Sequence, residues 1–334
     1  MGNIHDMMRS FELFQPTELD GALALLREHD EDAWVLSGGM DTFDWLKDRA
    51  KRPPVVIDVG AIEELRGVRE TADGGLEIGA ATTLTEVIEH PEVSRRYPLL
   101  ATAAGRVATP QIRNQGTLGG NVAQDTRCWY YRSGWPCYRA GGNVCYANTP
   151  TSINREHCIF EGDRCVAVSP SDTAPALVAL DATMVIRSHR GEREVPAADF
   201  FLDPGTDIRR MTALRPREIL VAIRLPTAWA GKPHYFEKVA DRKSWDFALA
   251  SVASALDVSD GVVRDARLVV GGVAARPLRL RAAEQSLIGR SIDNASVERT
   301  AALAIEGARP LRYNAYKVVL TRNLVKRAIQ GATA

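Results

Sequence analysis

The chain has 334 residues, of which 45% are hydrophobic and 25% are charged. This composition is typical of a globular protein with more than one hydrophobic core, so we expect two or three domains. Its 42 Lys and Arg residues balance its 42 Asp and Glu residues, which disfavours nucleic-acid binding as the main role. No apolar stretch reaches the roughly 18 residues of a membrane span. Residues 1–12 lack the basic start and apolar run of a signal peptide.

The first third of the chain predicts alternating helices and short strands. Apolar residues recur at helical spacing after Thr17, which we interpret as the N-cap of a helix over residues 18–27. Thr83 has the position of a second N-cap, before a helix that ends near Glu89. Short apolar runs bounded by Gly or Pro indicate strands. The predicted strands are 33–36, 55–59 and 76–80, and the other predicted helices are 43–47 and 99–107.

The rest of the chain predicts irregular backbone, then a second region of regular structure. Residues 111–121 indicate a polar loop, and residues 126–169 have no sustained period. Asp172 has the N-cap position of a predicted helix over 172–180. A boundary is expected at 231–233, and strands followed by helices are typical of an α+β domain. The other predicted strands are 182–187, 218–225, 235–239, 248–258 and 266–273, and the last predicted helices are 296–307 and 313–330.

Two glycine-rich turns have the composition of phosphate-binding loops. Consecutive glycines let backbone N–H groups converge on an anion, and Ser37-Gly38-Gly39 and Gln115-Gly116-Thr117-Leu118-Gly119-Gly120-Asn121 both have this character. Taken alone, each turn is more often purely structural. Neither matches the G-x-G-x-x-G or P-loop pattern, so an ordinary Rossmann or kinase-like site is disfavoured.

All five cysteines of the chain lie between Cys128 and Cys165. Cysteines used as small core residues would be scattered, so we infer that this segment binds a ligand through sulfur. An odd number of cysteines in a chain with ample apolar residues argues against a disulfide framework. No Cys-x-x-Cys occurs, which disfavours a zinc ribbon; iron–sulfur ligation is favoured, while zinc and free thiols stay open. His157, beside Cys158, is expected to be a surface or hydrogen-bonded residue rather than a ligand.

Three motifs occur in the order and spacing of one protein family: the turn at 37–42, the loop at 113–121 and Ser169-Pro170-Ser171-Asp172-Thr173. They resemble the FAD-binding middle subunit of the molybdenum hydroxylases, the family of xanthine dehydrogenase, carbon monoxide dehydrogenase and aldehyde oxidoreductases. The resemblance covers nearly the whole chain and implies that both glycine loops bind the FAD pyrophosphate. Met40 stands where the family usually has Thr, so a hydroxyl contact is lost there.

The resemblance implies an α+β fold with two domains. Residues 1–228 are expected to form a two-part FAD-binding domain of the molybdopterin dehydrogenase flavoprotein type, with subdomains at about 1–62 and 63–228. Residues 229–334 are expected to form a C-terminal α+β domain with a three-stranded sheet and helices. The FAD-binding residues that the resemblance implies are Leu36, Ser37, Gly38, Gly39, Met40, Asp41, Thr42, Thr109, Gln115, Thr117, Gly119, Gly120, Asn121, Asp125, Asp172, Leu220 and Lys238.

The cysteine segment, an insertion at about 126–169, resembles a subgroup whose middle subunit carries an extra [4Fe-4S] cluster. This subgroup contains 4-hydroxybenzoyl-CoA reductase and the bacterial three-subunit aldehyde oxidoreductases. The remaining cysteine, Cys158, has no counterpart in the pattern and is expected to be a buried spare thiol, with substitution for a ligand as the alternative. Nearby aromatic residues either shield such a cluster or fill a local core: Trp129, Tyr130, Tyr131 and Trp135. The implied metal ligands are Cys128, Cys137, Cys145 and Cys165.

The resemblance therefore implies an oxidoreductase subunit that transfers electrons through FAD and a [4Fe-4S] cluster and has no catalytic residue for substrate chemistry. The implied partners are a molybdopterin-binding large subunit, a small subunit with two [2Fe-2S] clusters, and an external acceptor or donor such as ferredoxin, a quinone or NAD. The cysteine spacing favours the aldehyde enzymes over the reversed electron flow of 4-hydroxybenzoyl-CoA reductase. A self-contained flavin reductase and a zinc-stabilised assembly module are the alternatives. We expect a cytoplasmic complex, or a periplasmic one if a partner carries the export signal.

Overall fold

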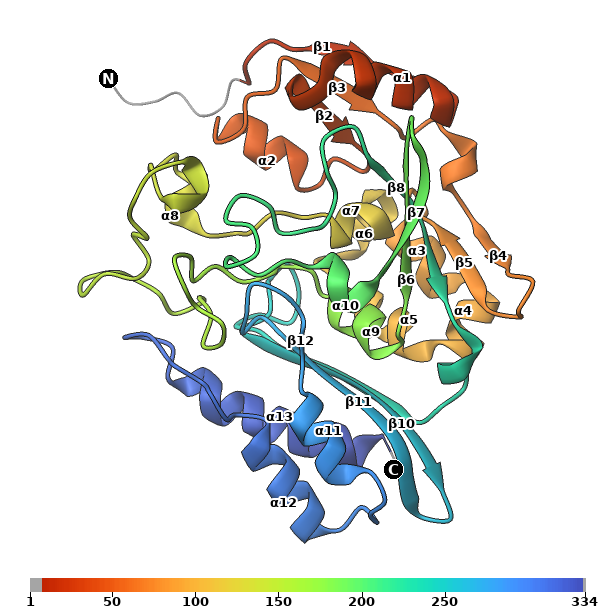
Figure 1. The fold of residues 1–334 in the computed structure, drawn as a ribbon, viewed down its shortest axis with the longest axis vertical. Coiled ribbons are helices and arrows are strands. Elements are labelled where there is room, and N and C mark those ends of the chain that lie inside the picture. The colour runs from red at the N-terminus through yellow and green to blue at the C-terminus, as the bar shows by residue number, and fades with distance from the viewer. Residues whose placement is uncertain (1–7, 333–334) are drawn as a thin grey trace.

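The computed structural model describes residues 8–332. Its N-terminal part is a parallel three-stranded sheet in the order β1-β3-β2, packed against helix α1 (Figure 1). This packing buries the apolar face of α1 against β3. The apolar side chains of the helix and of the strand thus form one small core. The elements are β1 (Glu12–Phe14), α1 (Leu19–His29), the 3-10 turn Asp30–Asp32, β2 (Ala33–Leu36), α2 (Thr42–Lys47), β3 (Val55–Asp58) and the 3-10 turn Glu63–Leu65.

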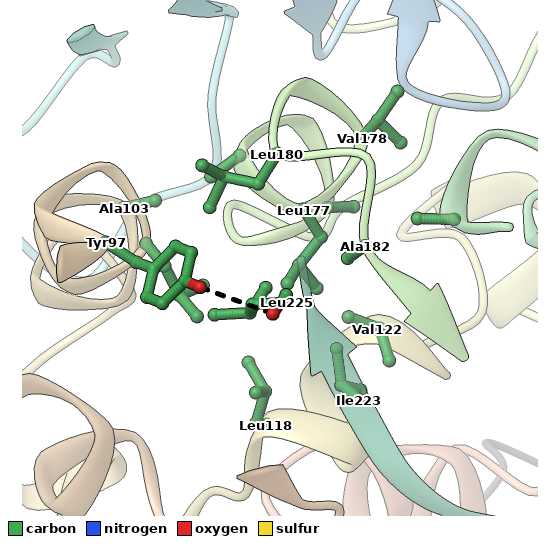
Figure 2. Close-up of a cluster of buried hydrophobic side chains, with 14 of the residues drawn as sticks. Tyr97, Ala103, Leu118, Val122, Leu177, Val178, Leu180, Ala182, Ile223 and Leu225 are labelled. Atoms are coloured by element: carbon green, nitrogen blue, oxygen red, sulfur yellow. Dashed lines mark hydrogen bonds between the residues drawn. The ribbon is translucent and has the colours of Figure 1, made fainter. Parts of the chain in front are cut away.

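The middle part is an antiparallel sheet in the order β4-β5-β8-β6-β7, covered by short helices (Figure 1). Figure 2 shows part of its core, where the hydroxyl of Tyr97 donates to the carbonyls of Leu225 (3.3 Å) and Pro226 (3.0 Å). The strands are β4 (Val68–Glu70), β5 (Leu76–Gly79), β6 (Thr183–Ser188), β7 (Gly191–Pro196) and β8 (Ile219–Leu225). The helices are α3 (Leu84–Glu89), α4 (Pro91–Arg96), α5 (Pro98–Gly105), α6 (Pro110–Gln115), α7 (Leu118–Val122), α9 (Ala174–Ala179) and α10 (Ala197–Phe200).

The C-terminal part is an antiparallel sheet in the order β12-β11-β10-β9, with three helices packed on it. The α+β fold class is confirmed, but the prediction of three strands was wrong: the two-residue strand β12 adds a fourth, too short to leave a hydrophobic pattern. The elements are the 3-10 turn Thr227–Trp229, β9 (His234–Val239), β10 (Ala250–Ser259), β11 (Val262–Gly271), β12 (Leu278–Arg279), α11 (Arg281–Leu287), α12 (Asn294–Leu303) and α13 (Tyr316–Gly331).

The cysteine segment lies between α7 and α9 and is mostly irregular, apart from α8 (Trp129–Arg132) and a 3-10 turn at Tyr138–Ala140. In Figure 1 its yellow to green trace projects between α2 and the C-terminal helices. The amide of Asn314 donates to the carbonyls of His157 and Cys158, both at 3.0 Å. Hydrogen bonds from the C-terminal domain thus hold a segment that has little secondary structure of its own.

Two local predictions were wrong for reasons visible in the structure. Residues 111–121 form two short helices instead of a loop, because Thr109 and Thr117 each cap a following helix with the side-chain oxygen. Thr17 does not cap the first helix, whose N-cap is Glu18 without a side-chain bond. The expectation for Thr83 is confirmed, since it forms a capping box with Glu86.

Lys317 predicts a measurable pH dependence of stability. Its side chain is fully buried and donates to the carbonyls of Glu156 (2.8 Å) and Gly272 (2.7 Å), and burial lowers its pKa to about 7. The folded state then binds fewer protons than the unfolded state above pH 7, so this contribution to stability increases as pH rises. Between pH 7 and 8.5, the free energy of unfolding should increase by about 1–2 kcal/mol more than in Lys317→Met. Urea titrations of both proteins at the two pH values measure this difference. Equal changes in the free energy of unfolding in the parent protein and in Lys317→Met would contradict the prediction.

Candidate functional site

A cavity of about 530 Å³ lies where the two glycine-rich turns meet. A side chain at Gly38 would overlap the carbonyl oxygen of Gln115, and a Cβ at Gly119 would lie 2.7 Å from the carbonyl oxygen of Ala80. The two turns are therefore packed backbone against backbone, which only glycine permits at these positions. The hydroxyls of Ser37 and Thr117, 3.0 Å apart, also join the turns.

The first turn presents unpaired backbone donors to this cavity. Gly38 and Gly39 both line it, and within residues 8–332 their N–H groups have no protein acceptor. Successive unpaired N–H groups at a concave surface form a binding site for a phosphate-like anion. The cavity wall thus fits the pyrophosphate of a dinucleotide through main-chain atoms, without a Rossmann fingerprint.

The third motif joins the second turn through Asn121. Its side-chain oxygen accepts hydrogen bonds from the hydroxyls of Ser171 (2.7 Å) and Thr173 (2.6 Å), and all of these residues are buried. A satisfied buried polar network of this kind fixes the segments that it connects. The three motifs that are separate in the sequence therefore surround one cavity.

Asp172 and Lys238 form a buried ion pair at the cavity, with a distance of 2.5 Å between Oδ2 and Nζ. Burial raises the pKa of Asp172 to about 6, and the Lys238 ammonium opposes the increase. Lys238 also donates to the carbonyl of Asp246 (2.6 Å). The prediction of an N-cap at Asp172 was wrong. Asp172 is instead the partner of a lysine on β9, and the N-cap of α9 is Thr173.

Most of the residues predicted to bind FAD line the cavity, but four do not. Leu36, Thr109, Gln115 and Lys238 lie outside its lining: Gln115 supports Gly38 and Thr109 caps α6. The predicted residues in the lining are Ser37, Gly38, Gly39, Met40, Asp41, Thr42, Thr117, Gly119, Gly120, Asn121, Asp125, Asp172 and Leu220.

Sequence reasoning missed two aromatic residues at the cavity. Trp245 and Phe247 line it and are 65% and 41% exposed, flanking Asp246. Trp245 has a left-handed backbone with φ of 52°, and its N–H donates to the carbonyl of Ala108 (3.0 Å), which is also left-handed with φ of 41°. The left-handed backbone of these two cavity-lining residues is a form of strain that is common at functional sites. The cluster of polar residues around Trp245 offered no pattern that distinguishes this loop from an ordinary turn.

Four of the cysteines lie in two local clusters of side chains: Cys128 and Cys137 with Trp45 and Tyr131, and Cys145 and Cys158 with Ala147 and Val166. Burial raises the pKa of Cys128 to about 12 and that of Cys165 to about 11. Burial also raises the pKa of Cys158, which is 3% exposed, to about 12. Buried thiols of this kind stay protonated at neutral pH unless a metal or a cation stabilises the thiolate. Thiols whose pKa is raised in this way are unsuited to nucleophilic chemistry.

The surroundings of the thiols contain unpaired donors. Arg139 Nε and His157 Nδ1 are buried without a hydrogen-bond partner, and His157 Nε2 lies 3.3 Å from the sulfur of Cys128. Burial lowers the pKa of His157 to about 4, so the ring is neutral. In the described part of the chain, no group of three or more His, Cys, Asp or Glu side chains is arranged to hold a metal ion. The thiols are thus not gathered around one ion as in a closed zinc site.

The aromatic residues of the segment differ in exposure and packing. Trp129 and Trp135 are 52% and 45% exposed, whereas Tyr131 is buried edge-on against Trp45 with ring centroids 5.4 Å apart. Tyr131 therefore belongs to a local core. Trp135 packs edge-on against Tyr130 and Tyr146, which also makes it part of an aromatic group beside the cysteines.

Comparison with known proteins decides the family. The family model of the FAD-binding domain in molybdopterin dehydrogenase matches residues 9–228, and that of the CO dehydrogenase flavoprotein C-terminal domain matches residues 234–332. The chain is an FAD-binding medium subunit of the molybdenum hydroxylase family. As such, this medium subunit is part of an oxidoreductase, and the expectation of FAD binding is confirmed at the level of the family.

The relatives of this medium subunit are similar over almost their whole length. It is 34% identical to the aldehyde oxidoreductase FAD-binding subunit PaoB of Escherichia coli, covering 93% of this chain and 95% of PaoB. It is 33% identical to the carbon monoxide dehydrogenase medium chain of Hydrogenophaga pseudoflava, covering 97% of each. A structure of that carbon monoxide dehydrogenase matches with a TM-score of 0.78 over 98% of both chains. The name of PaoB mentions FAD, and none of these names mentions an iron–sulfur cluster in the subunit.

The buried ion pair of this medium subunit predicts a large loss of stability. Replacing Lys238 by Met leaves the carboxylate of Asp172 buried without its partner, which should lower the free energy of unfolding by about 3–5 kcal/mol. Adding Asp172→Asn removes the uncompensated charge and should recover part of the loss. Urea unfolding followed by circular dichroism measures both effects. If the free energy of unfolding of Lys238→Met alone stayed within about 1 kcal/mol of that of the parent protein, the pair would not be buried.

Proposed function

We propose that this medium subunit transfers electrons between an FAD in the cavity and a [4Fe-4S] cluster held by Cys128, Cys137, Cys145 and Cys165. The proposal rests mainly on one observation: Arg127 lines the cavity, and Cys128 is the next residue. Consecutive Cα atoms are about 3.8 Å apart, so a cluster ligated by Cys128 lies close to a flavin in the cavity. The buried thiols and unpaired donors of the segment support an anionic, sulfur-bound group.

The two groups have complementary chemistry, since a flavin exchanges one or two electrons and an iron–sulfur cluster exchanges one. The residues of the chain bind and orient them. Main-chain N–H groups of Gly38 and Gly39 would hold the pyrophosphate, and Leu220, 6% exposed, supplies an apolar wall. The Asp172–Lys238 pair fixes β9 against the cavity. None of these side chains performs chemistry on an organic substrate.

Two ion-pair groups connect the cysteine segment to the cavity wall. Asp41 lines the cavity and accepts from Arg127 (2.7 Å) and Arg132 (2.5 Å) of the segment. Asp125 lines it too and accepts from Arg139 (2.6 Å). Because the same carboxylates belong to both sites, the segment cannot move away from the cavity without breaking partly buried ion pairs. This rigidity supports a fixed distance for electron transfer.

The partners are part of the same proposal. A molybdopterin-binding large subunit would act on the substrate, and a small subunit with two [2Fe-2S] clusters would pass electrons to this chain. The 34% identity to an aldehyde oxidoreductase subunit supports an aldehyde as the substrate class and release of electrons to an external acceptor. No described helix is long and apolar enough to cross a membrane.

Anaerobic titration of the assembled complex with an aldehyde tests the electron path. We expect bleaching of the flavin absorbance together with the electron paramagnetic resonance signal of a reduced [4Fe-4S] cluster. Bleaching of the flavin while an iron-containing segment stays oxidised would contradict the path. A parallel assay of the isolated chain with NADH and a dye separates the proposal from a self-contained flavin reductase, which would turn over without partners.

A further inference from the structure

A second cavity of about 250 Å³ adjoins the FAD cavity, and Asp246 lines both of them. Its wall consists of residues 238–244, Asp246 and Arg106, the C-cap of α5. Pockets that enclose a small organic ligand usually have volumes of roughly 300–1,000 Å³. The smaller size of this cavity disfavours a ligand that is fully enclosed in it.

The wall of this second cavity has an excess of positive charge. Arg106 and Lys243 are exposed and form no ion pair with any of residues 8–332. Arg242 Nε lies 3.9 Å from a carboxylate oxygen of Asp246, too far for a hydrogen bond. The remaining carboxylate of the wall, Asp241, is already bound at 2.6 and 2.7 Å by an arginine of the cysteine segment. Because the whole chain has a net charge of zero, this excess is a local feature.

The buried cation of the wall, Lys238, has no donor left for a ligand. Its side chain is 6% exposed, and its Nζ donates to Asp172 (2.5 Å) and to the carbonyls of Arg106 (3.1 Å) and Asp246 (2.6 Å). An ammonium has three donors, so all of them are used. A tight site for a small anion is therefore disfavoured. The exposed cations act over a distance instead, as charges that steer a large acidic partner.

The loop that carries these charges is held in one conformation by its own contacts. The N–H groups of Arg242 and Phe247 donate to the two carboxylate oxygens of Asp246, each at 3.0 Å. Arg242 Nη2 donates to the carbonyl of Trp245 (2.6 Å), whose N–H donates to Ala108 (3.0 Å). A loop that is ordered before binding loses little conformational entropy when a partner docks on it.

Exposed apolar side chains surround the mouth of the FAD cavity beside this loop. Twelve large hydrophobic side chains of the described residues are exposed, and four of them line this one cavity: Met40, Phe43, Trp245 and Phe247. Trp245 has the highest exposure of the twelve, at 65%. An exposed aromatic side chain with cations around it has the composition of a protein interface, with an apolar centre and a charged rim.

We propose that residues 241–247, together with Arg106, form the docking surface for an acidic one-electron carrier protein that accepts electrons from the flavin. Trp245 is the apolar centre of this surface, and Arg106, Arg242 and Lys243 are its charged rim. The inference rests on the proposed function, but only on its flavin and not on the cysteine segment. Each oxidised carrier takes one electron from the reduced flavin, so two carriers restore FAD, and the protons of the reduced flavin pass to water.

The test is calorimetric titration of the FAD-loaded chain, and of the assembled complex, with an acidic [2Fe-2S] ferredoxin as the probe. We expect binding that weakens by about tenfold or more between about 0.05 M and about 0.5 M NaCl, because salt screens exposed charges. The basic protein cytochrome c is the probe of opposite charge. It should bind at least about tenfold more weakly than ferredoxin at the lower salt concentration.

Single charge reversals identify the surface. Lys243→Glu and Arg106→Glu should each weaken ferredoxin binding by about tenfold at low salt and by much less at high salt. Arg264→Glu is the matched control, since Arg264 is exposed and unpaired within residues 8–332 but lies on β11, outside both cavities. Trp245→Ala should weaken binding by about tenfold or more at both salt concentrations, because an apolar contact is not screened.

Three results would overturn the inference. They are equal affinities of Lys243→Glu and Arg264→Glu for ferredoxin, equal affinities of the parent protein for the two probes, and ferredoxin binding to the isolated chain but not to the assembled complex. The last result would make the surface an interface between subunits. Absence of flavin from the parent protein would instead overturn the proposed function, so the two failures are distinguishable.

Discussion

Gly38→Ala is expected to abolish retention of FAD. The added methyl group would overlap the carbonyl oxygen of Gln115 and lie 2.9 Å from the Cα atom of Gly116, so the two glycine turns must separate. Both contacts are with backbone, which cannot move out of the way by a change of rotamer. Overpacking of this kind costs about 1–3 kcal/mol or more, and here the displaced atoms form the cavity wall itself.

The expected result is a weakening of FAD binding by about tenfold to a hundredfold or more, with loss of flavin during gel filtration. Gly105→Ala is the matched control, because a Cβ at Gly105 would meet no atom within 4 Å and the residue is the last of α5. The control should retain FAD and be as stable as the parent protein, or slightly more so. Equal flavin content in the two variants would contradict the role of the turns.

Cys128→Ala is expected to remove the iron from the chain, whereas Cys158→Ala is expected to leave it. Cys128 follows the cavity-lining residue Arg127, and a [4Fe-4S] cluster with three thiolates is much less stable than one with four. Cys158 is 3% exposed and packs against Ala147 and Val166, as a small core residue does. The variants therefore separate a ligand from a spare thiol.

The measurement is iron content per chain after anaerobic purification, with FAD content as the control for folding. Iron should decrease from about four atoms to well below one in Cys128→Ala and stay near four in Cys158→Ala. The opposite pattern would make Cys158 the ligand and revise the set of four. Full iron in both variants would contradict ligation by Cys128.

The sequence predicted the parts of the fold and of the site that depend on local patterns. The glycine turns, the strands at 33–36 and 55–59 and the N-cap at Thr83 each carry their signal within a few residues, and the structure has them in the expected places. The grouping of the cysteines in one segment was visible for the same reason. How the cysteines are arranged in space could not be predicted, because the segment has almost no regular secondary structure.

Features that depend on distant contacts were not predictable. Asp172 has the sequence context of an N-cap, and only β9, far along the chain, supplies the lysine that pairs with it. The helices at 110–115 and 118–122 were obscured by glycines, although Thr-Pro at 109–110 was an available start signal. The burial of Arg139 could not be inferred, since arginine is seldom buried without a full set of partners.

The most direct test of the account is the content of FAD, iron and acid-labile sulfide in the chain purified without oxygen. We predict about four iron atoms and four sulfides for each FAD, in a yellow-brown protein. Flavin with neither iron nor sulfide, or colourless protein that contains zinc, would contradict the claim that this subunit joins a flavin to an iron–sulfur cluster.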